Sequence, residues 1–387
     1  MRIWHLPASS PCKVNGVNAS TWLVARAQAQ LGHQVTLLFD EPIDAAASAM
    51  AGQAGLALVH VPASSMQYDA RVIESLLRAA PPHVVHMHSV FIARQAALAR
   101  SLVRCGIPYV ITPHGGVQPQ VLRRGWMRKK LYSLFIERAR FYRASAISVL
   151  TANEEEHVRA FVPGYTGLIR RVPNPVDTFR LGGHRWKGNV EAKRLVYLGR
   201  FDVLCKGIDR LVEIARLAPD MEFRLYGTED AKTRGWLRRL RRDLPSNVHF
   251  HGPVFGADEA RVLAEASLYI QTSRWEAWGI SVAQAMYVGV PCAIADTLDI
   301  AGLLRKYDLG LLLPRDPKKA VRCLLEALSQ PARLQQWAAR ARSFALEHTR
   351  PQTVASAFLR LYEEVAVERR RPASSVAVMV RQTGSQF

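Results

Sequence analysis

A regular alternation of short apolar runs with amphipathic segments is the feature that most constrains the fold of this chain. The apolar runs are short enough, and rich enough in β-branched residues, to be buried strands, and the segments between them carry apolar residues at helical spacing. In the first half we expect strands at Arg2–Leu6, Gln34–Phe39, Leu56–Val61, Val84–His88, Tyr109–Thr112 and Ala146–Leu150, and helices at Asn18–Leu31, Ala70–Ala80, Ile92–Arg104 and Trp126–Arg143. Short crossovers of this kind are typical of parallel sheets in α/β proteins.

The alternation is interrupted once, by a segment dense in proline and glycine from Pro173 to His184. Such composition favours turns. A second series of expected strands follows at Leu195–Leu198, Phe223–Tyr226, Val248–His251, Leu268–Gln271, Cys292–Ala295 and Gly310–Leu313. We therefore predict two α/β domains, residues 1–178 and 179–350, then a helix over residues 351–368 and a disordered tail over residues 369–387.

Composition narrows the class of protein further. Of the 387 residues, 49% are hydrophobic and 22% are charged, which excludes a disordered or fibrous chain. No apolar run reaches the roughly 18 residues of a membrane-spanning helix, and the N-terminus has no secretory pattern. Five scattered cysteines suggest reduced thiols in a cytoplasmic protein rather than a zinc site or disulfide framework. The formal net charge of +20 indicates an anionic partner.

The stretch from Ser273 to Pro291 combines a strand end, a glycine turn and the start of a helix near Ile280. A helix N-terminus after such a turn presents free N–H groups and the positive end of the helix dipole to an anion. Glu276 precedes the turn and is placed to hold the hydroxyls of a neutral polyol. The alternative interpretation is a helix cap at Glu276 and a solvated Gln284.

Two cations follow the first expected strand of the second domain. Arg200 comes directly after the strand, and Lys206 precedes Gly207 at the start of the next helix. Ligands of open α/β sheets bind at the carboxyl ends of strands, so this pair suits a diphosphate. In a chain this basic, such a pair also arises by chance.

Histidines follow or end two expected strands of the first domain. His114 precedes two glycines that allow close backbone approach, and its imidazole can donate to or accept from a reacting group. His86 and His88 point the same way along one strand, as a metal pair would. No third ligand with suitable spacing is evident, and we interpret both as structural.

The succession of these motifs resembles the family 4 (group 1) retaining glycosyltransferases. Five motifs occur in the family's order over roughly residues 1–350, which is more specific than any one of them. They are the Asn15-Gly16 loop, Thr112–Gly115, Val172–Asp177, Gly199–Gly207 and Ser273–Gly279.

The resemblance implies a GT-B fold, in which two Rossmann-like domains face each other across a cleft and a C-terminal helix crosses back to the first domain. It places a UDP- or GDP-linked sugar donor mainly in the second domain. The residues it implies for donor binding are Gly16, Arg200, Lys206, Gly279, Ile280, Ser281 and Gln284, and those it implies for catalysis are His114 and Glu276.

In these roles Arg200 and Lys206 would grip the diphosphate, and Glu276 would bind the hydroxyls of the transferred sugar. The resemblance further implies metal-independent, retaining transfer of a hexosyl group, in which the diphosphate accepts the acceptor's proton. No cofactor besides the nucleotide sugar is expected. Family members commonly carry a second glutamate where this chain has Gln284, which can hydrogen-bond a ribose hydroxyl but has no charge.

The densest basic segment runs from Arg123 to Arg143 and contains one acidic residue, Glu137. Its interleaved apolar residues make a basic amphipathic helix, which is typical of an anionic membrane interface. A solvated basic face is the alternative. The residues assigned to membrane binding are Arg123, Arg124, Arg128, Lys129 and Lys130. A second basic cluster, Arg234 to Arg242, is expected on the other domain.

The leading hypothesis is a transferase peripheral to the cytoplasmic face of the inner membrane. It would extend a lipid-linked saccharide or polysaccharide precursor of the cell envelope or an exopolysaccharide. The alternatives are another GT-B activity, such as sugar-nucleotide epimerisation, and a degenerate GT-B scaffold that binds anionic surfaces without catalysis. No helix-turn-helix or aromatic–basic strand pattern supports nucleic acid as a partner.

Overall fold

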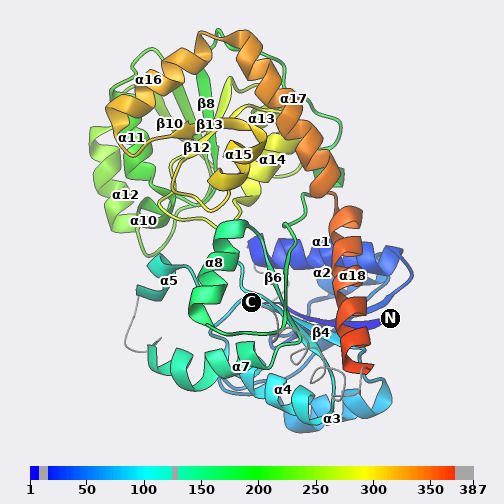
Figure 1. The fold of residues 1–387 in the computed structure, drawn as a ribbon. Helices are drawn as coiled ribbons and strands as arrows, with labels where there is room; N and C mark the ends of the chain where they lie inside the picture. Colours follow the sequence, from blue (N-terminus) through cyan, green and yellow to red (C-terminus); the bar gives the residue numbers. More distant parts are fainter. Residues whose placement is uncertain (8–15, 124–129, 371–387) are drawn as a thin grey trace, which may run out of the picture.

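A computed structural model describes residues 1–7, 16–123 and 130–370, and in that part of the chain two parallel sheets form the centres of two α/β domains (Figure 1). The first sheet has seven strands in the order β3-β2-β1-β4-β5-β6-β7, and the second has six in the order β10-β9-β8-β11-β12-β13. Both orders reverse direction beside their first strand, as in Rossmann-like domains. The expected fold, two such domains with a crossing C-terminal helix, is confirmed.

The strands lie close to where the apolar runs predict them. They are β1 (Arg2–Leu6), β2 (Gln34–Phe39), β3 (Leu56–His60), β4 (Val84–His88), β5 (Tyr109–Thr112), β6 (Ala146–Val149), β7 (Leu168–Arg171), β8 (Arg194–Leu198), β9 (Glu222–Tyr226), β10 (Val248–His251), β11 (Leu268–Gln271), β12 (Cys292–Ala295) and β13 (Gly310–Leu313). Of the strands that the structure describes, β7 alone has no counterpart among the expected strands, because its partly exposed, arginine-rich sequence lacks an apolar run.

Helices connect the strands and cover both sheets (Figure 1). In the first domain they are α1 (Gly16–Gln30), α2 (Ala45–Gln53), α3 (Ala70–Ala79), α4 (Ala93–Arg104), α5 (Pro119–Arg123), the π-helical turn η1 (Ser133–Glu137), α7 (Arg138–Tyr142) and α8 (Ala152–Phe161). In the second they are α9 (Thr178–Leu181), α10 (Val203–Lys206), α11 (Ile208–Arg216), α12 (Arg234–Leu240), the 3₁₀ turn η2 (Arg241–Asp243), α13 (Ala257–Ala264), α14 (Ile280–Val288), α15 (Ala301–Tyr307), α16 (Pro317–Leu328) and α17 (Pro331–His348).

The side-chain alternation along β1 shows how each sheet separates two cores. Trp4 and Leu6 pack in one cluster with Val85 and Met87 of β4. Ile3 lies in a cluster on the opposite face, with Val84 and residues of α1. Because side chains alternate along a strand, His5 shares the face of Ile3, and His86 and His88 share the face of Val84.

The last helix, α18 (Pro351–Arg370), returns to the first domain and lies beside α1 (Figure 1). Its buried side chains Phe358 and Tyr362 pack against the α1 side of the first sheet. The helix extends two residues past the expected end at 368. The predicted domain boundary at residue 178 coincides with the start of α9 and stays a prediction, and the predicted disordered tail from 371 onward lies outside the described residues.

The helix expected over Trp126–Arg143 is confirmed over residues 130–142, but one of its turns is π-helical. Residues 130–132 are α-helical, a π-helical turn follows at Ser133–Glu137, and α7 then ends at Tyr142. Trp126 and Met127 lie outside the described residues. Among the helices that the structure does describe, none is both long and apolar enough to cross a bilayer.

Candidate functional site

The predicted site residues follow the carboxyl ends of strands at or next to the reversal point of each sheet: Gly16 follows β1 and His114 follows β5 in the first domain, and Arg200 and Glu276 follow β8 and β11 in the second. In the first domain this point lies between β1 and β4, and in the second between β8 and β11. Crossover helices leave these two neighbouring strands in opposite directions, which opens a crevice where ligands of such sheets bind. Arg200 follows β8, and Glu276 follows β11, so sheet topology brings these motifs together.

Lys206 and Glu276 form an ion pair in the second domain, with both side chains largely buried. Burial lowers the pKa of Lys206, but the Glu276 carboxylate more than offsets this effect and leaves that pKa raised. Gln271, at the end of β11, donates from Nε2 to the same carboxylate oxygen at 3.4 Å. The structure therefore pairs Lys206, which is predicted to bind the diphosphate, with Glu276, which is predicted to bind the sugar.

Arg200 is held differently from Lys206. It donates to Asp230 at 2.6 Å, while its own side chain stays 59% exposed. Arg274 fixes the helix α10, which carries Lys206, by donating to the carbonyl of Val203. The same guanidinium donates to both carboxylate oxygens of Asp209 at 2.8 and 2.6 Å. Sequence reasoning missed these residues, since Arg274 and Asp209 are 65 positions apart.

The N-terminus of α14 forms where the glycine turn predicts it. Gly279 has φ +73°, a conformation that glycine adopts without strain, and caps the helix that begins at Ile280. Ser281 accepts a hydrogen bond from Tyr269 of β11 at 2.8 Å. Gln284 lies half-buried one turn further along the helix.

The first domain contributes the loop that carries His114 to the candidate site. His114 has φ +50°, and Ser89 and Phe91, which follow β4, also lie in the left-handed region at +73° and +60°. Such strain in non-glycine residues gathers at functional sites. Glu154 of α8 fixes the loop by accepting from the backbone N–H groups of Gly115 and Leu150 at 2.5 and 2.6 Å. Burial raises the pKa of Glu154 to about 7.

The two domains touch through these loops. A Cβ placed on Gly115 would lie 2.8 Å from the Cβ of Ala277, and one on Gly16 would lie 2.6 Å from Cδ1 of Ile280. Gln118 of the first domain donates to Asp299 of the second at 2.7 Å. The predicted residues Gly16 and Ile280 therefore meet across the interface, as do the segments that carry His114 and Glu276. Asn15 and the rest of the first loop lie outside the described residues.

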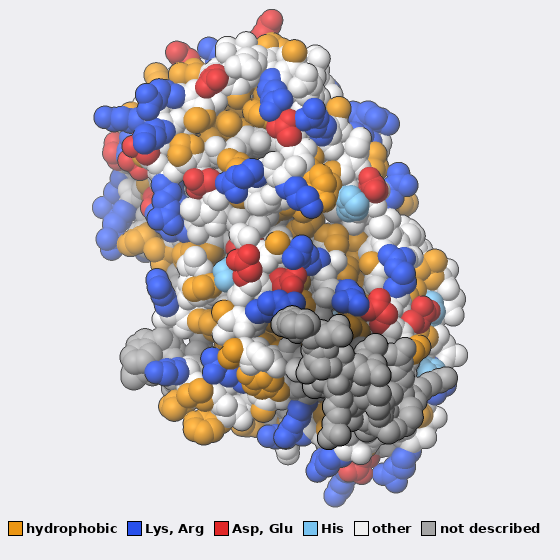
Figure 2. All heavy atoms as spheres, viewed as in Figure 1, with side chains coloured by type: hydrophobic (Ala, Val, Ile, Leu, Met, Phe, Trp, Pro, Cys, Tyr) orange, Lys and Arg blue, Asp and Glu red, His pale blue; other side chains and the backbone are white. Residues whose placement is uncertain are grey.

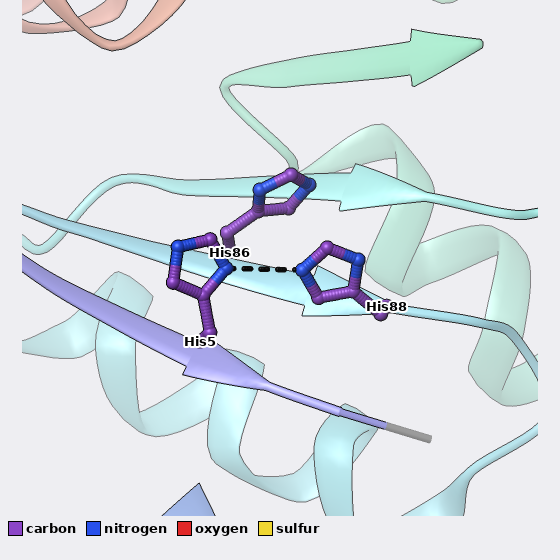
Figure 3. Close-up of side chains that lie close together, drawn as sticks. All are labelled: His5, His86 and His88. Atoms are coloured by element: carbon purple, nitrogen blue, oxygen red, sulfur yellow. Dashed lines mark hydrogen bonds between the residues drawn. The ribbon is translucent and has the colours of Figure 1, made fainter. Parts of the chain in front are cut away.

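Three histidines gather on the α1 side of the first sheet: His5 of β1, with His86 and His88 of β4 (Figure 3). His5 pairs with His86 in the strand register. His5 is the third potential ligand, which the spacing of residues around His86 and His88 in the sequence does not reveal. Among the described residues these three are the candidates for holding a metal ion, since their ligand atoms lie within 4.8 Å of one another.

Hydrogen bonds already occupy the ring nitrogens of this cluster. His86 contacts the Tyr362 hydroxyl and Thr112 Oγ1, each at 2.7 Å. His5 contacts Gln28 at 2.8 Å and His88 at 3.0 Å. The arrangement is thus satisfied as a hydrogen-bonded network, which agrees with the structural interpretation of His86.

Basic side chains are spread over both domains on the face drawn in Figure 2. Of the residues assigned to membrane binding, Arg123 and Lys130 are exposed, and Arg124, Arg128 and Lys129 lie outside the described residues. Next to Lys130, the apolar side chains Leu131, Leu134 and Phe135 are 60%, 48% and 75% exposed.

Arg140 does not belong to that surface, although it falls within the basic run. It is buried, pairs with the buried Glu137 at 2.5 Å and donates to the carbonyl of Ser89. The second basic cluster forms as expected on α12 and η2 of the other domain.

Two family models match the chain. The model described as "Glycosyl transferase 4-like domain" matches residues 15–175, and the one described as "Glycosyl transferases group 1" matches residues 192–330. Together they cover every described strand of the two sheets except β1, and they include the predicted site residues from Gly16 to Gln284.

Curated relatives and a solved structure agree with these models. The chain is 28% identical over 212 residues to phosphatidyl-myo-inositol mannosyltransferase of Mycobacterium tuberculosis (50% of this chain, 54% of that protein). It is 23% identical over 256 residues to GDP-mannose:cellobiosyl-diphosphopolyprenol alpha-mannosyltransferase of Xanthomonas campestris (64% and 65%). The matches thus span about half to two thirds of these relatives' lengths. Sucrose-phosphate synthase of Thermosynechococcus elongatus superposes with a TM-score of 0.77 at 18% identity (95% and 99%), which shows a shared fold.

Proposed function

The chain belongs to the family 4 (group 1) glycosyltransferases and has their GT-B fold, and from that premise we propose that it transfers a hexosyl group from a nucleotide-sugar donor to a lipid-linked saccharide or polysaccharide precursor. The observation that carries the proposal is the contact between the His114 loop and the Glu276 loop. Two motifs from different domains, 162 positions apart, border one site at the interface, as a bound donor and acceptor require.

The cations at this site supply what a departing nucleotide needs. Lys206 and Arg200 would offset the charge that develops on the diphosphate as the bond to the sugar breaks, and the free N–H groups of α14 would bind a phosphate. A UDP- or GDP-linked donor suits this set. Glu276 would bind the sugar hydroxyls, and Lys206, which contacts Glu276, would bind the neighbouring diphosphate.

We further propose retention without a metal ion or other cofactor. The acceptor oxygen would attack the anomeric carbon on the face from which the diphosphate leaves. One C–O bond forms as the other breaks, and the acceptor's proton passes to the diphosphate. His114 would face the sugar and the acceptor from the first domain, and Gln284 would meet the donor with an uncharged amide.

Attachment to an anionic cytoplasmic leaflet follows from the same proposal. The names of both relatives specify lipid-linked substrates, phosphatidyl-myo-inositol and a diphosphopolyprenol. The exposed apolar residues beside Lys130 would insert into the interface of such a membrane, and the surrounding cations would contact its headgroups. Enzymes that use a membrane-bound acceptor gain from this placement because it raises the local acceptor concentration.

Donor turnover is the direct test. The protein is incubated with a panel of UDP- and GDP-linked sugars, with and without lipid extract, and released nucleotide is measured. We expect release from at least one donor, stimulated by extract, and a loss of at least about tenfold in Glu276→Ala. Glu347→Ala, which removes an exposed carboxylate of the second domain, is the matched control and should keep wild-type turnover.

The alternatives give different outcomes in the same assay. An epimerase would convert the nucleotide sugar into a stereoisomer without release of nucleotide. A non-catalytic scaffold would bind donors or anionic surfaces and turn over none of the panel. Either result would contradict the transferase proposal.

A further inference from the structure

A row of hydrogen-bonded imidazoles runs from the interior of the first domain to the domain interface. His5 Nε2 lies 2.8 Å from Gln28 Oε1, and His5 Nδ1 lies 3.0 Å from Nε2 of His88. His88 Nδ1 lies 3.0 Å from Nε2 of His114. The row ends at His114 Nδ1, which is buried and has no hydrogen-bond partner among the described residues.

The imidazoles of the row are neutral near pH 7. Burial lowers the pKa of His5 to about 4 and that of His114 to about 3, and it holds the pKa of His88 well below the ordinary value. A neutral imidazole carries one N–H, so one ring nitrogen donates and the other accepts. The donor at one hydrogen bond of the row therefore determines the donor at the next.

Gln28 sets the direction of the row. Its Oε1 faces His5 and can only accept, so Nε2 of His5 carries the proton and Nδ1 accepts from His88. Gln28 lies on the buried side of α1, and its Nε2 has no hydrogen-bond partner among the described residues.

The proton on His5 also fixes which nitrogens of His88 and His114 donate. Because His88 donates from Nε2 to His5, its Nδ1 accepts from Nε2 of His114. Nδ1 of His114 then holds a lone pair. The rings of His86 and His88 lie side by side, with centroids 4.1 Å apart and planes tilted by 31°, but His86 forms its hydrogen bonds with Tyr362 and Thr112 and so lies outside the row.

We propose that Gln28, His5 and His88 are positioning residues that hold His114 in the Nε2–H tautomer, so that His114 Nδ1 accepts a hydrogen bond from a hydroxyl of the substrate bound between the domains. The tautomer follows from this chain's contacts alone. The identification of the partner as a hydroxyl of the donor sugar or the saccharide acceptor rests on the proposed function.

Nitrogen NMR on the unliganded, ¹⁵N-histidine-labelled protein tests the tautomer without any turnover. We expect His5, His88 and His114 all to carry their proton on Nε2, with ¹⁵N–¹⁵N couplings across the His88–His5 and His114–His88 hydrogen bonds. A proton on His114 Nδ1, absence of these couplings, or stoichiometric metal bound to the purified protein would overturn the proposal.

Two variants of His88 separate positioning from packing. In His88→Asn, the side-chain oxygen lies near the place of Nδ1 and can still accept from His114, whereas His88→Leu offers no acceptor. With the nucleotide sugar that the wild-type protein turns over, we expect kcat/KM to fall by about tenfold or more in His88→Leu, and most of that loss to be recovered in His88→Asn. His60→Asn, on an exposed histidine of the same sheet, should match the wild type.

Equal losses in the two His88 variants, with both folded by circular dichroism, would overturn the positioning role. A wild-type protein that turns over no donor but shows the expected couplings contradicts the proposed function and leaves the tautomer assignment intact. The two failures are therefore distinguishable.

Discussion

At the scale of single residues, Gly115 is where the first domain meets the second. Its φ of +78° favours glycine, and any Cβ there would lie 2.8 Å from the Cβ of Ala277. We expect Gly115→Ala to keep the domains from closing around the donor. Because small displacements of reacting groups are costly, kcat/KM should fall by roughly tenfold to a hundredfold, as measured by nucleotide release.

Gly164 provides the matched control for this prediction. Its φ is +76°, but a Cβ there meets nothing within 4 Å, so Gly164→Ala imposes similar backbone strain without the contact between domains. We expect near-normal turnover in Gly164→Ala. Replacing Ala277 by glycine in the Gly115→Ala background should restore part of the loss, and a double variant no better than the single one would contradict the steric explanation.

At the scale of elements, the helical segment over residues 130–142 exposes apolar side chains because its opposite side is anchored. The buried pair of Glu137 and Arg140 ties that side to Gln95 and to the loop after β4. The exposed side is therefore directed outward by the fold.

Liposome flotation tests whether this element attaches the protein to membranes. We expect stronger recovery with anionic than with neutral vesicles and release by salt, since each basic residue near an anionic surface contributes about 1 kcal/mol. Phe135→Ser and Lys130→Glu should both lower recovery, and Phe179→Ser, at a phenylalanine that is 82% exposed elsewhere, should not. Equal recovery with both lipids, or no effect of salt, would argue against electrostatic attachment.

At the scale of the whole molecule, the buried histidines make stability depend on pH. Their folded pKa values lie below the unfolded value of about 6.5, so the unfolded state binds more protons as the pH falls, and stability is lost between about pH 6.5 and the folded values near 4 and 3. For His5 alone the loss by pH 4 is about 3 kcal/mol. Glu154 and Glu259, whose pKa values burial raises to about 7, act in the opposite direction between about pH 7 and 4.5.

Urea unfolding at a series of pH values checks this balance. Below about pH 4.5 the glutamates no longer compensate, and we expect the free energy of unfolding to fall steeply there. The slope should be shallower in His88→Asn, which removes one of the buried imidazoles. A free energy of unfolding that is constant or rises from about pH 5 to 3.5 would contradict the assignment of these histidines as buried and neutral.

Local patterns were sufficient for most of the architecture. The bounds of β1, β2, β4 and β5 agree with the apolar runs, and the turn at Gly279 ends where α14 begins. These features depend on periodicity and on conformational preferences of neighbouring residues, which are present in the sequence itself. Where the local pattern is weak, as in the arginine-rich β7, or where one turn of a helix becomes π-helical, the prediction was incomplete.

The sequence alone determined the two α/β domains, the family resemblance and the chemical types of residue at the strand ends. Only the tertiary structure decided which of these residues meet. His5 lies 83 positions from His88 and 23 from Gln28, and Lys206 lies 70 from Glu276. Such contacts arise because strand order places β1 beside β4 and β8 beside β11, and because α1 packs on the face of the first sheet that carries His5. The periodicity of apolar residues along the chain does not reveal the order of the strands in each sheet.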